Sequence, residues 1–407
     1  MNDAEQLAPP RRAAVPRGLL TTGPILFSYG FRPFFLGAAI WACCAMTLWI
    51  LALTGRIDLA GDYGAHAWHA HEMLFGFASA VLAGFLLTAV PNWTGRLPVS
   101  GKPLFFLFLL WVAGRISMLV PDLAGSAVAA AIDAVFLPTL LIICVREVVA
   151  GKKWADLKVI AGLAVLSLAN ICFHIETIVN GAPDISPRLA ISAYIGMVIV
   201  VGGRILPSFT RNWLAKQGAI GFPVPYGRYD TVTILASVAV LLFWSLHPEG
   251  PVVALAAITV ALLQAIRLYR WRGWRTFAEP LIVILHIAYL FVPLGFLAIA
   301  AAAVGKMDGP AAMHVLTIGT VTSMMLAVMI RATRGHTGRI LTSSVSTNLS
   351  YAAIMICAVA RPLTSVFPDH TDSLHAIAGL SWLAAFLLFL SEYAPMLIRK
   401  RRQVPGR

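Results

Sequence analysis

Long apolar stretches, separated by short polar segments, recur along almost the whole chain. A helix needs about 20 mostly apolar residues to cross roughly 30 Å of hydrocarbon, and the stretches have that length. They lie at residues 33–53, 67–90, 103–120, 126–148, 158–179, 189–209, 230–246, 251–269, 278–303, 311–331, 349–367 and 374–396. The pattern predicts an all-α protein, a polytopic transmembrane helical bundle of about 12 spans.

Basic residues are concentrated in the loops that follow the even-numbered stretches. These are Arg96, Lys102, Lys152, Lys153, Lys158, Arg211, Lys216, Arg228, Arg270, Arg272, Arg275, Arg334 and Arg339. The other loops are short and acidic or turn-like, for example Pro121-Asp122 and Pro368-Asp369. By the positive-inside rule, both termini are predicted to be cytoplasmic. The predicted organisation is a cytoplasmic tail over 1–30, a single twelve-helix domain over 31–397 and a basic cytoplasmic tail over 398–407.

Composition excludes an ordinary soluble domain. Hydrophobic residues make up 59% of the 407 residues and charged residues 12%, and the mean hydropathy is +0.81. The net charge of +13 is explained by the loop pattern, so we expect a lipid bilayer and no nucleic acid as the partner. The five cysteines lie in apolar stretches without a CxxC spacing, which favours packing roles. The first 30 residues lack the pattern of a cleaved signal peptide, so the first stretch is expected to direct insertion.

Histidines inside the apolar stretches are the first candidates for chemistry. An ionisable group in hydrocarbon is costly unless it is paired, hydrated or bound to a metal. With the predicted topology, six histidines share a depth near the outer face, and imidazoles from several helices can hold iron or copper there. These six are His66, His69, His71, His174, His314 and His375. His286 is expected deeper, about a dozen ångströms from the cytoplasmic end. The alternative is that each histidine only bonds to a neighbouring helix.

Neighbouring carboxylates and arginines complete the candidate site. Residues two apart on a helix diverge by about 200°, so His69 and His71 are expected to face different points. Glu72 and Glu176 are candidate proton-relay or ligand-supporting groups, whereas the alternative for Glu176 is a solvated carboxylate at the edge of a loop. Arg115 and Arg204 are candidates for anchoring an anionic cofactor.

Three further charged residues in or near the spans have simpler interpretations. Asp133, an acidic residue in the interior of the fourth stretch, is a candidate partner for either Arg115 or Arg204. Arg32 and Arg331 are interpreted as anchors that extend towards the interface. No Walker loop, nucleophile elbow or HExxH motif occurs, so the sequence gives no support for nucleotide use or hydrolysis.

Five separated segments resemble the NnrS family, and the resemblance covers nearly the whole chain. They are Phe31-Arg32-Pro33-Phe34-Phe35, Trp68-His69-Ala70-His71-Glu72-Met73-Leu74-Phe75-Gly76, Val90-Pro91-Asn92-Trp93-Thr94-Gly95, Gly202-Gly203-Arg204-Ile205-Leu206-Pro207-Ser208-Phe209-Thr210, and Arg331 through Arg339, which contains Gly335-His336-Thr337-Gly338-Arg339. The resemblance implies a bacterial inner-membrane protein with haem b and copper, linked to denitrification and to protection against nitric oxide.

Carried over by position, the resemblance implies metal ligands among five histidines. They are His69, His71, His174, His286 and His314. We expect a protein that binds nitric oxide or reduces it, with His71 and His314 as the preferred axial haem ligands and with electrons from quinol or a periplasmic donor. Two alternatives remain at this point: a transporter or channel for a small anion or metal ion, and a scaffold for assembly of denitrification enzymes.

Overall fold

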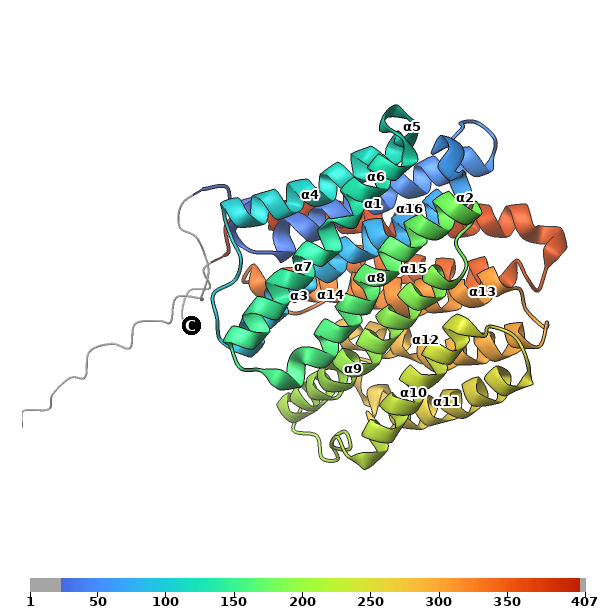
Figure 1. Ribbon diagram of the computed structural model, residues 1–407. Coiled ribbons are helices and arrows are strands. Elements are labelled where there is room, and N and C mark those ends of the chain that lie inside the picture. The colour runs from blue at the N-terminus through green and yellow to red at the C-terminus, as the bar shows by residue number, and fades with distance from the viewer. Residues whose placement is uncertain (1–22, 403–407) are drawn as a thin grey trace, which may run out of the picture.

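The computed structural model describes residues 23–402 and consists of long helices that run in alternating directions (Figure 1). Residues 1–22 and 403–407 lie outside this part, and with them most of the predicted tail over 1–30. The long helices are α1 (Phe31–Leu53), α4 (Lys102–Leu119), α8 (Leu157–Asn180), α9 (Ile185–Lys216), α10 (Arg228–Leu246), α11 (Pro251–Arg270), α12 (Pro280–Ala303), α15 (Val345–Leu363) and α16 (Thr371–Ile398). No strand occurs within residues 23–402.

Three further spans are built from shorter helices. The helices α2 (Ala65–His71) and α3 (Ala78–Thr94) are joined by a π-helical segment at Glu72–Phe77. In the same way α13 (Gly309–His314) and α14 (Ser323–His336) are joined by a π-helical segment at Val315–Thr322. The third of these spans contains α6 (Ser126–Ala134) and α7 (Phe136–Ala150) and follows a single turn, α5 (Pro121–Ala124).

Eleven helices of the described chain are long and apolar enough to cross a membrane, which confirms eleven of the twelve predicted spans. The remaining prediction, 349–367, falls on α15, which has 19 residues and packs against α16. Polar residues in its first turns and Arg361 near its end make α15 less apolar than the others.

Arg32 joins the beginning of the first span to the end of the last. Its guanidinium is buried and donates to the backbone oxygens of Leu397 at 2.6 Å and Arg399 at 2.9 Å, which satisfies carbonyl groups at the C-terminus of α16. The expectation that Arg32 extends to the interface is therefore wrong. Since the start of α1 and the end of α16 lie on one face, the number of crossings is even, which supports α15 as a crossing in addition to the eleven.

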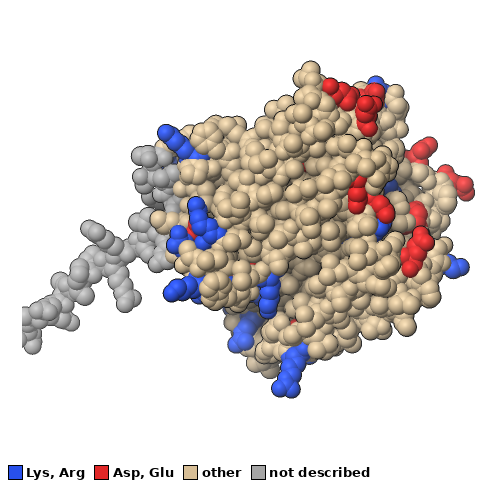
Figure 2. Space-filling model, in the orientation of Figure 1, with Lys and Arg blue, Asp and Glu red and all other residues tan. Residues whose placement is uncertain are grey.

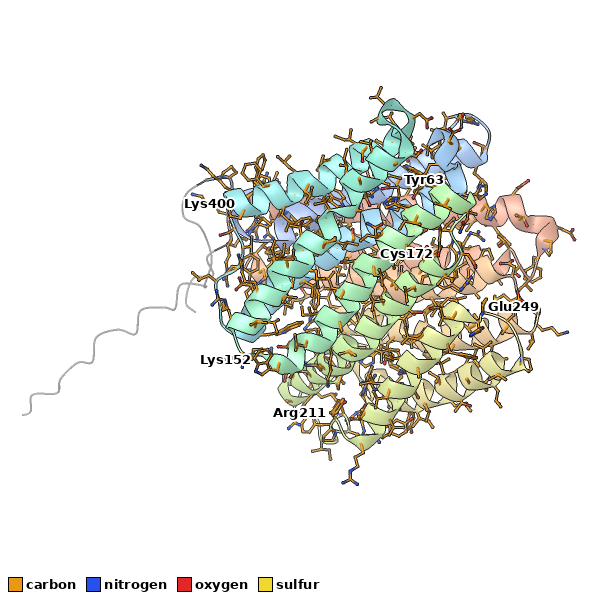
Figure 3. The ribbon with its side chains drawn as sticks, in the orientation of Figure 1. Tyr63, Lys152, Cys172, Arg211, Glu249 and Lys400 are labelled. Atoms are coloured by element: carbon orange, nitrogen blue, oxygen red, sulfur yellow. The ribbon has the colours of Figure 1, made fainter. Side chains whose placement is uncertain are left out.

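Charged residues separate between the two ends of the bundle. Figure 2 shows most of the visible Lys and Arg at one end and most of the Asp and Glu at the other. In Figure 3, Lys152, Arg211 and Lys400 lie at the basic end, and Tyr63 and Glu249 lie at the opposite end. We call these ends the basic face and the acidic face. The assignment of the basic face to the cytoplasm stays a prediction.

Candidate metal centre

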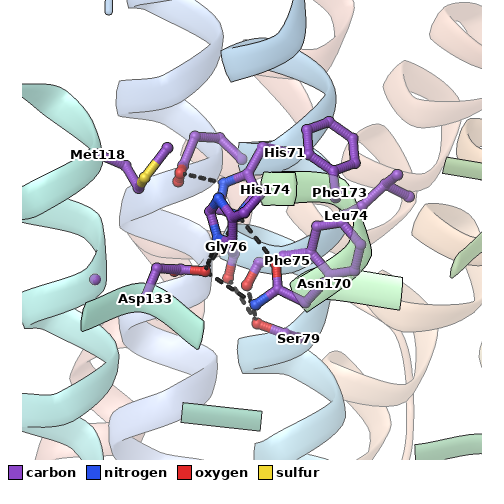
Figure 4. A network of polar contacts seen from close by, with 12 residues as sticks. His71, Leu74, Phe75, Gly76, Ser79, Met118, Asp133, Asn170, Phe173 and His174 are labelled. Carbon is purple, nitrogen blue, oxygen red and sulfur yellow. Dashed lines mark hydrogen bonds and ion pairs between the residues drawn. The ribbon is translucent and has the colours of Figure 1, made fainter. Parts of the chain in front are cut away.

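Three buried ligand-type side chains converge between three helices near the acidic face (Figure 4). His71 comes from the end of α2, Asp133 from the last turn of α6 and His174 from α8. Their relative exposures are 0%, 2% and 4%. One ligand atom from each lies within 4.8 Å of the others, which is close enough for a single metal ion.

The local sequence aims these side chains inward. His71 is the last α-helical residue before the π-helical segment Glu72–Phe77, and short π-helical segments often mark functional sites because the extra residue redirects side chains. Asn170 and His174 are four residues apart on α8, so they share one helix face. The π-helical turn is wider than an α-helical turn, and some of its backbone carbonyl groups accept hydrogen bonds from side chains.

Every polar neighbour of His71 is an acceptor. Its Nδ1 lies 2.9 Å from Glu72 Oε1, and its Nε2 lies 3.1 Å from both Asp133 Oδ2 and Asn170 Oδ1. Carboxylate and amide oxygens cannot donate to a ring nitrogen. Each nitrogen of His71 must therefore either carry a proton or bind a cation.

His174 has the same two-sided arrangement. Its Nε2 lies 3.0 Å from Asp133 Oδ2, and its Nδ1 lies 3.0 Å from the hydroxyl of Tyr63. Tyr63 precedes the second span, and burial raises the pKa of its phenol above the usual range, so the hydroxyl remains neutral. The Nε2 atoms of both histidines thus face one carboxylate oxygen, while other side chains hold their Nδ1 atoms.

Arg115 on α4 neutralises part of the negative charge. Its guanidinium pairs with both Glu72 and Asp133, and Trp41 Nε1 donates to Glu72 Oε2 at 2.7 Å. The carboxylates of Glu72 and Asp133 and the guanidinium of Arg115 together have a net charge of one negative unit. A protonated imidazole or a metal cation balances this charge. The predicted pairing of Asp133 with Arg115 is thereby confirmed.

His69 and His314 lie in a second group at the acidic face. The ring of His69 stacks on Trp49 with centroids 4.4 Å apart, so it does face away from His71, as predicted. Within residues 23–402, Nδ1 of His69 is buried and has no hydrogen-bond partner. His314 lies near His69, and its Nδ1 lies 2.6 Å from the carbonyl oxygen of Pro310. Arg361 lies in electrostatic range of both histidines.

The other predicted site residues lie apart from both groups. His286 on α12 faces Thr210, with Nε2 2.8 Å from its hydroxyl. Glu176 accepts from the backbone nitrogens of Asp184 and Ser186 at the start of α9. Arg204 is not buried, contrary to expectation: its side chain is 53% exposed and pairs with Asp156 at 2.9 Å.

Sequence reasoning gave Asn170 and Tyr63 no role in the site. Asn170 carried a usable signal, because it is polar, lies in an apolar stretch and precedes His174 by one helical turn. Tyr63 carried none, since it lies in a short 3-10 turn outside the spans and reaches His174 only through the tertiary fold.

Comparison with known proteins identifies the family. The family model described as NnrS protein matches residues 25–401, nearly the whole chain. No curated protein matches the chain. The resemblance seen in five separated segments of the sequence is thereby confirmed, and the chain, a multi-pass helical membrane protein, belongs to the NnrS family.

Proposed function

We propose that this protein is a metalloprotein of the bacterial inner membrane that binds nitric oxide and reduces it. Family membership supports a role related to nitric oxide. The observation that carries the proposal is the convergence of His71 Nε2 and His174 Nε2 on Asp133 Oδ2. Histidines that bind a metal usually give their other nitrogen to a fixed partner, and Glu72 and Tyr63 are such partners here.

Two imidazoles and one carboxylate form a donor set that suits copper, iron or zinc. We propose copper, which would supply one-electron chemistry at this position. Asp133 would balance its charge, and Arg115 would hold the carboxylate in place through its other oxygen. Three donors would leave further coordination positions on such an ion, and a small ligand such as nitric oxide would bind there.

The surroundings of His71 disfavour it as the axial haem ligand that was preferred from the sequence. Its ring centroid is only 4.6 Å from that of His174, and the oxygens of Asp133 and Asn170 occupy the space beside Nε2. A macrocycle needs a free axial nitrogen and an open face. We therefore assign the proposed haem b to His69 and His314, where the unpartnered Nδ1 of His69 is the supporting observation. Arg361 would pair with a haem propionate.

The proposed reaction is balanced when two molecules of nitric oxide take two electrons and two protons. One N–N bond forms and one N–O bond breaks, which gives nitrous oxide and water. Quinol, oxidised to quinone, or a reduced periplasmic protein would supply the electrons. Glu72 is the proposed proton-holding group, since it contacts His71, Arg115 and Trp41 at the centre of the cluster.

Metal analysis of the full chain in lipid nanodiscs tests the proposal. We expect copper and haem in the wild-type protein, and a haem spectrum that shifts when nitric oxide is added without oxygen. His174→Gln should lose copper but keep haem, and His314→Gln should lose haem but keep copper. His286→Gln is the matched control and should keep both.

Two outcomes would overturn the proposal. Copper that remains stoichiometric in His174→Gln would remove the centre from His71, His174 and Asp133. A wild-type protein without copper, iron or a Soret band after reconstitution would favour the alternative of a transporter or channel for a small anion or metal ion.

A further inference from the structure

A cavity of about 90 Å³ lies inside the bundle, between the metal centre and the basic face. Its walls come from α3, α8, α9, α12 and α14. Together with α7 these helices contact one another in a closed ring, in the order α3, α7, α8, α9, α12, α14 and back to α3. The cavity therefore lies within this ring of helices and is partly open, since lining residues such as Val198 and Val328 are half-buried.

Apolar side chains make up the wall, among them Leu82, Phe85, Val198, Met325 and Val328. Water in such a cavity would lack hydrogen-bond partners, so an apolar occupant is favoured. Lining residues on α9 extend from Tyr194 to Leu206, roughly 18 Å at 1.5 Å per residue. A volume of about 90 Å³ spread over that length makes the space narrow, which suits a single hydrocarbon chain.

Tyr194 closes the end nearer the metal centre. Its ring lines the cavity, and its hydroxyl donates to the carbonyl oxygen of Leu74 at 2.7 Å, inside the π-helical segment. The hydroxyl is thus already bonded, and this end of the cavity offers no binding group for a polar ligand.

Arg331 marks the opposite end. On α14 it follows the lining residue Val328 by three positions, so both lie on the same side of the helix. Phe209 follows the lining residue Ile205 by four positions on α9. The Arg331 guanidinium lies over the Phe209 ring, 4.1 Å from its centroid, and so brings a positive charge to the basic-face end of the cavity.

The charge of Arg331 is available for a ligand. Within residues 23–402 the guanidinium makes no hydrogen bond and no ion pair; Glu279 and the Tyr351 hydroxyl lie nearby without bonding to it. Arg204 lies near the same end over the Trp93 ring, at 5.7 Å, but it is paired with Asp156. An unpaired guanidinium beside an apolar channel is complementary to a molecule with an anionic head and an apolar chain.

We propose that the cavity binds a free long-chain carboxylate, with its hydrocarbon chain between α3, α9 and α14 and its carboxylate on Arg331. A phospholipid is disfavoured because its second acyl chain has no place in the narrow cavity. The site is separate from the metal centre, and the proposal does not depend on metal binding.

Native mass spectrometry of the full chain in zwitterionic nanodiscs tests the site, with dodecanoate as the probe and methyl dodecanoate as its neutral counterpart. We expect one bound dodecanoate per chain and no retained ester. Arg331→Gln should weaken dodecanoate binding at least roughly tenfold, because a charge-assisted hydrogen bond is lost. Val198→Phe should fill the cavity and abolish binding.

Val232→Phe is the matched control, since Val232 is 60% exposed on α10 and does not line the cavity. Its dodecanoate affinity should equal that of the wild type. Val328→Phe on the opposite wall serves as a second filling variant if Val198→Phe does not fold. Equal retention of the ester and the acid, retention of phospholipid in place of dodecanoate, or full binding by a folded filling variant would each overturn the proposal.

Discussion

Asp133 on α6 contacts side chains from three other helices of the metal centre, α2, α4 and α8. One of its oxygens pairs with Arg115, and the other faces His71, His174 and Asn170. Removal of one partner from a buried ion pair leaves an uncompensated charge, which costs more than the pair contributes. The carboxylate is therefore both a candidate ligand and the main counter-charge of the cluster.

Asp133→Asn should lower the free energy of unfolding by roughly 3 to 5 kcal/mol, because Arg115 loses a buried partner. Asp184→Asn is the control, since Asp184 is 75% exposed in its ion pair with Arg188 and its loss should change little. Thermal unfolding in nanodiscs measures both. A melting temperature for Asp133→Asn equal to that of the control would contradict the role of Asp133.

Tyr63 gives the protein a predicted sensitivity to alkali. Burial raises the pKa of its phenol, so its contribution to stability is complete below the unfolded value of about 10 and is lost as the pH rises further. Tyr63→Phe has no such group. We expect the melting temperature of the wild type to fall more steeply than that of Tyr63→Phe between about pH 9 and about pH 11. Parallel curves would show that Tyr63 is not buried in a neutral form.

The tyrosine hydroxyl also has a predicted effect on metal affinity. Loss of a group that orients a metal-binding histidine typically weakens metal binding about 10- to 100-fold. Tyr63→Phe should show this loss in a competitive copper titration, whereas Tyr226→Phe, at an exposed position, should match the wild type. An unchanged affinity would mean that the Tyr63 contact does not hold His174.

The sequence predicted which residues belong to the polar cluster better than it predicted which residues contact one another. His71, Glu72 and Arg115 were identifiable because each is ionisable and lies in an apolar stretch. The grouping of these residues with His174 was not predictable from helical spacing. Residues at the same depth in the membrane can lie on helices that are not neighbours. Arg204 shows the converse, because an arginine within an apolar stretch turned out to be half exposed.

The π-helical segments are the elements that distinguish this bundle from a set of straight helices. Each follows a histidine directly, His71 in the second span and His314 in the tenth. In the first segment the released carbonyl oxygens of Leu74 and Gly76 accept from Tyr194 and from Trp111 Nε1. Side chains from other helices thus fix the wide turn, and with it the direction of His71.

Gly76 allows this turn to pack closely on the charged cluster. A Cβ atom there would overlap Arg115 and Glu72, so Gly76→Ala should disturb their ion pair and cost about 1 to 3 kcal/mol. Gly196→Ala is the matched control, because a Cβ atom at Gly196 would meet nothing within 4 Å. Unfolding temperature and copper content measure the effect, and equal values for the two variants would contradict it.

The ends of a helix were predictable where the apolar stretch ends with the helix. They were not predictable where polar side chains pack inside the bundle. The apolar stretches predicted twelve spans, of which eleven are confirmed. The twelfth prediction starts at 349, whereas α15 begins four residues earlier, at Val345. Its first turns are polar because Thr347 contacts Tyr393 at 2.6 Å and Ser350 contacts the backbone of Ala385 at 2.8 Å. The π-helical segments have no signature in the apolar period, so they could not be predicted.

The whole molecule has an acidic face and a basic face, with both described ends of the chain on one side. This arrangement agrees with an even number of crossings and with the predicted position of both termini in the cytoplasm. The metal centre is close to the acidic face: His71 lies six residues into the second span, roughly 9 Å along the helix axis. In the predicted orientation it is nearer the periplasm.

Cysteine labelling in intact cells tests this orientation. In a variant without the five native cysteines, Glu249→Cys in the loop between α10 and α11 should react with a membrane-impermeant maleimide. Lys153→Cys, between α7 and α8, should react only after the cells are opened. The reverse pattern would place the basic face outside and contradict the prediction.

The bond between Arg32 and the end of α16 has a consequence for synthesis of the protein. Its acceptor Leu397 lies 365 residues further along the chain, so at 5–20 residues per second the ribosome needs roughly 20 to 70 s to deliver it. During that time the guanidinium of the first inserted helix has no final acceptor and depends on water, lipid head groups or the insertion machinery. The charge of Arg32 in the first helix thus stays without its final hydrogen-bond acceptor until translation is nearly complete.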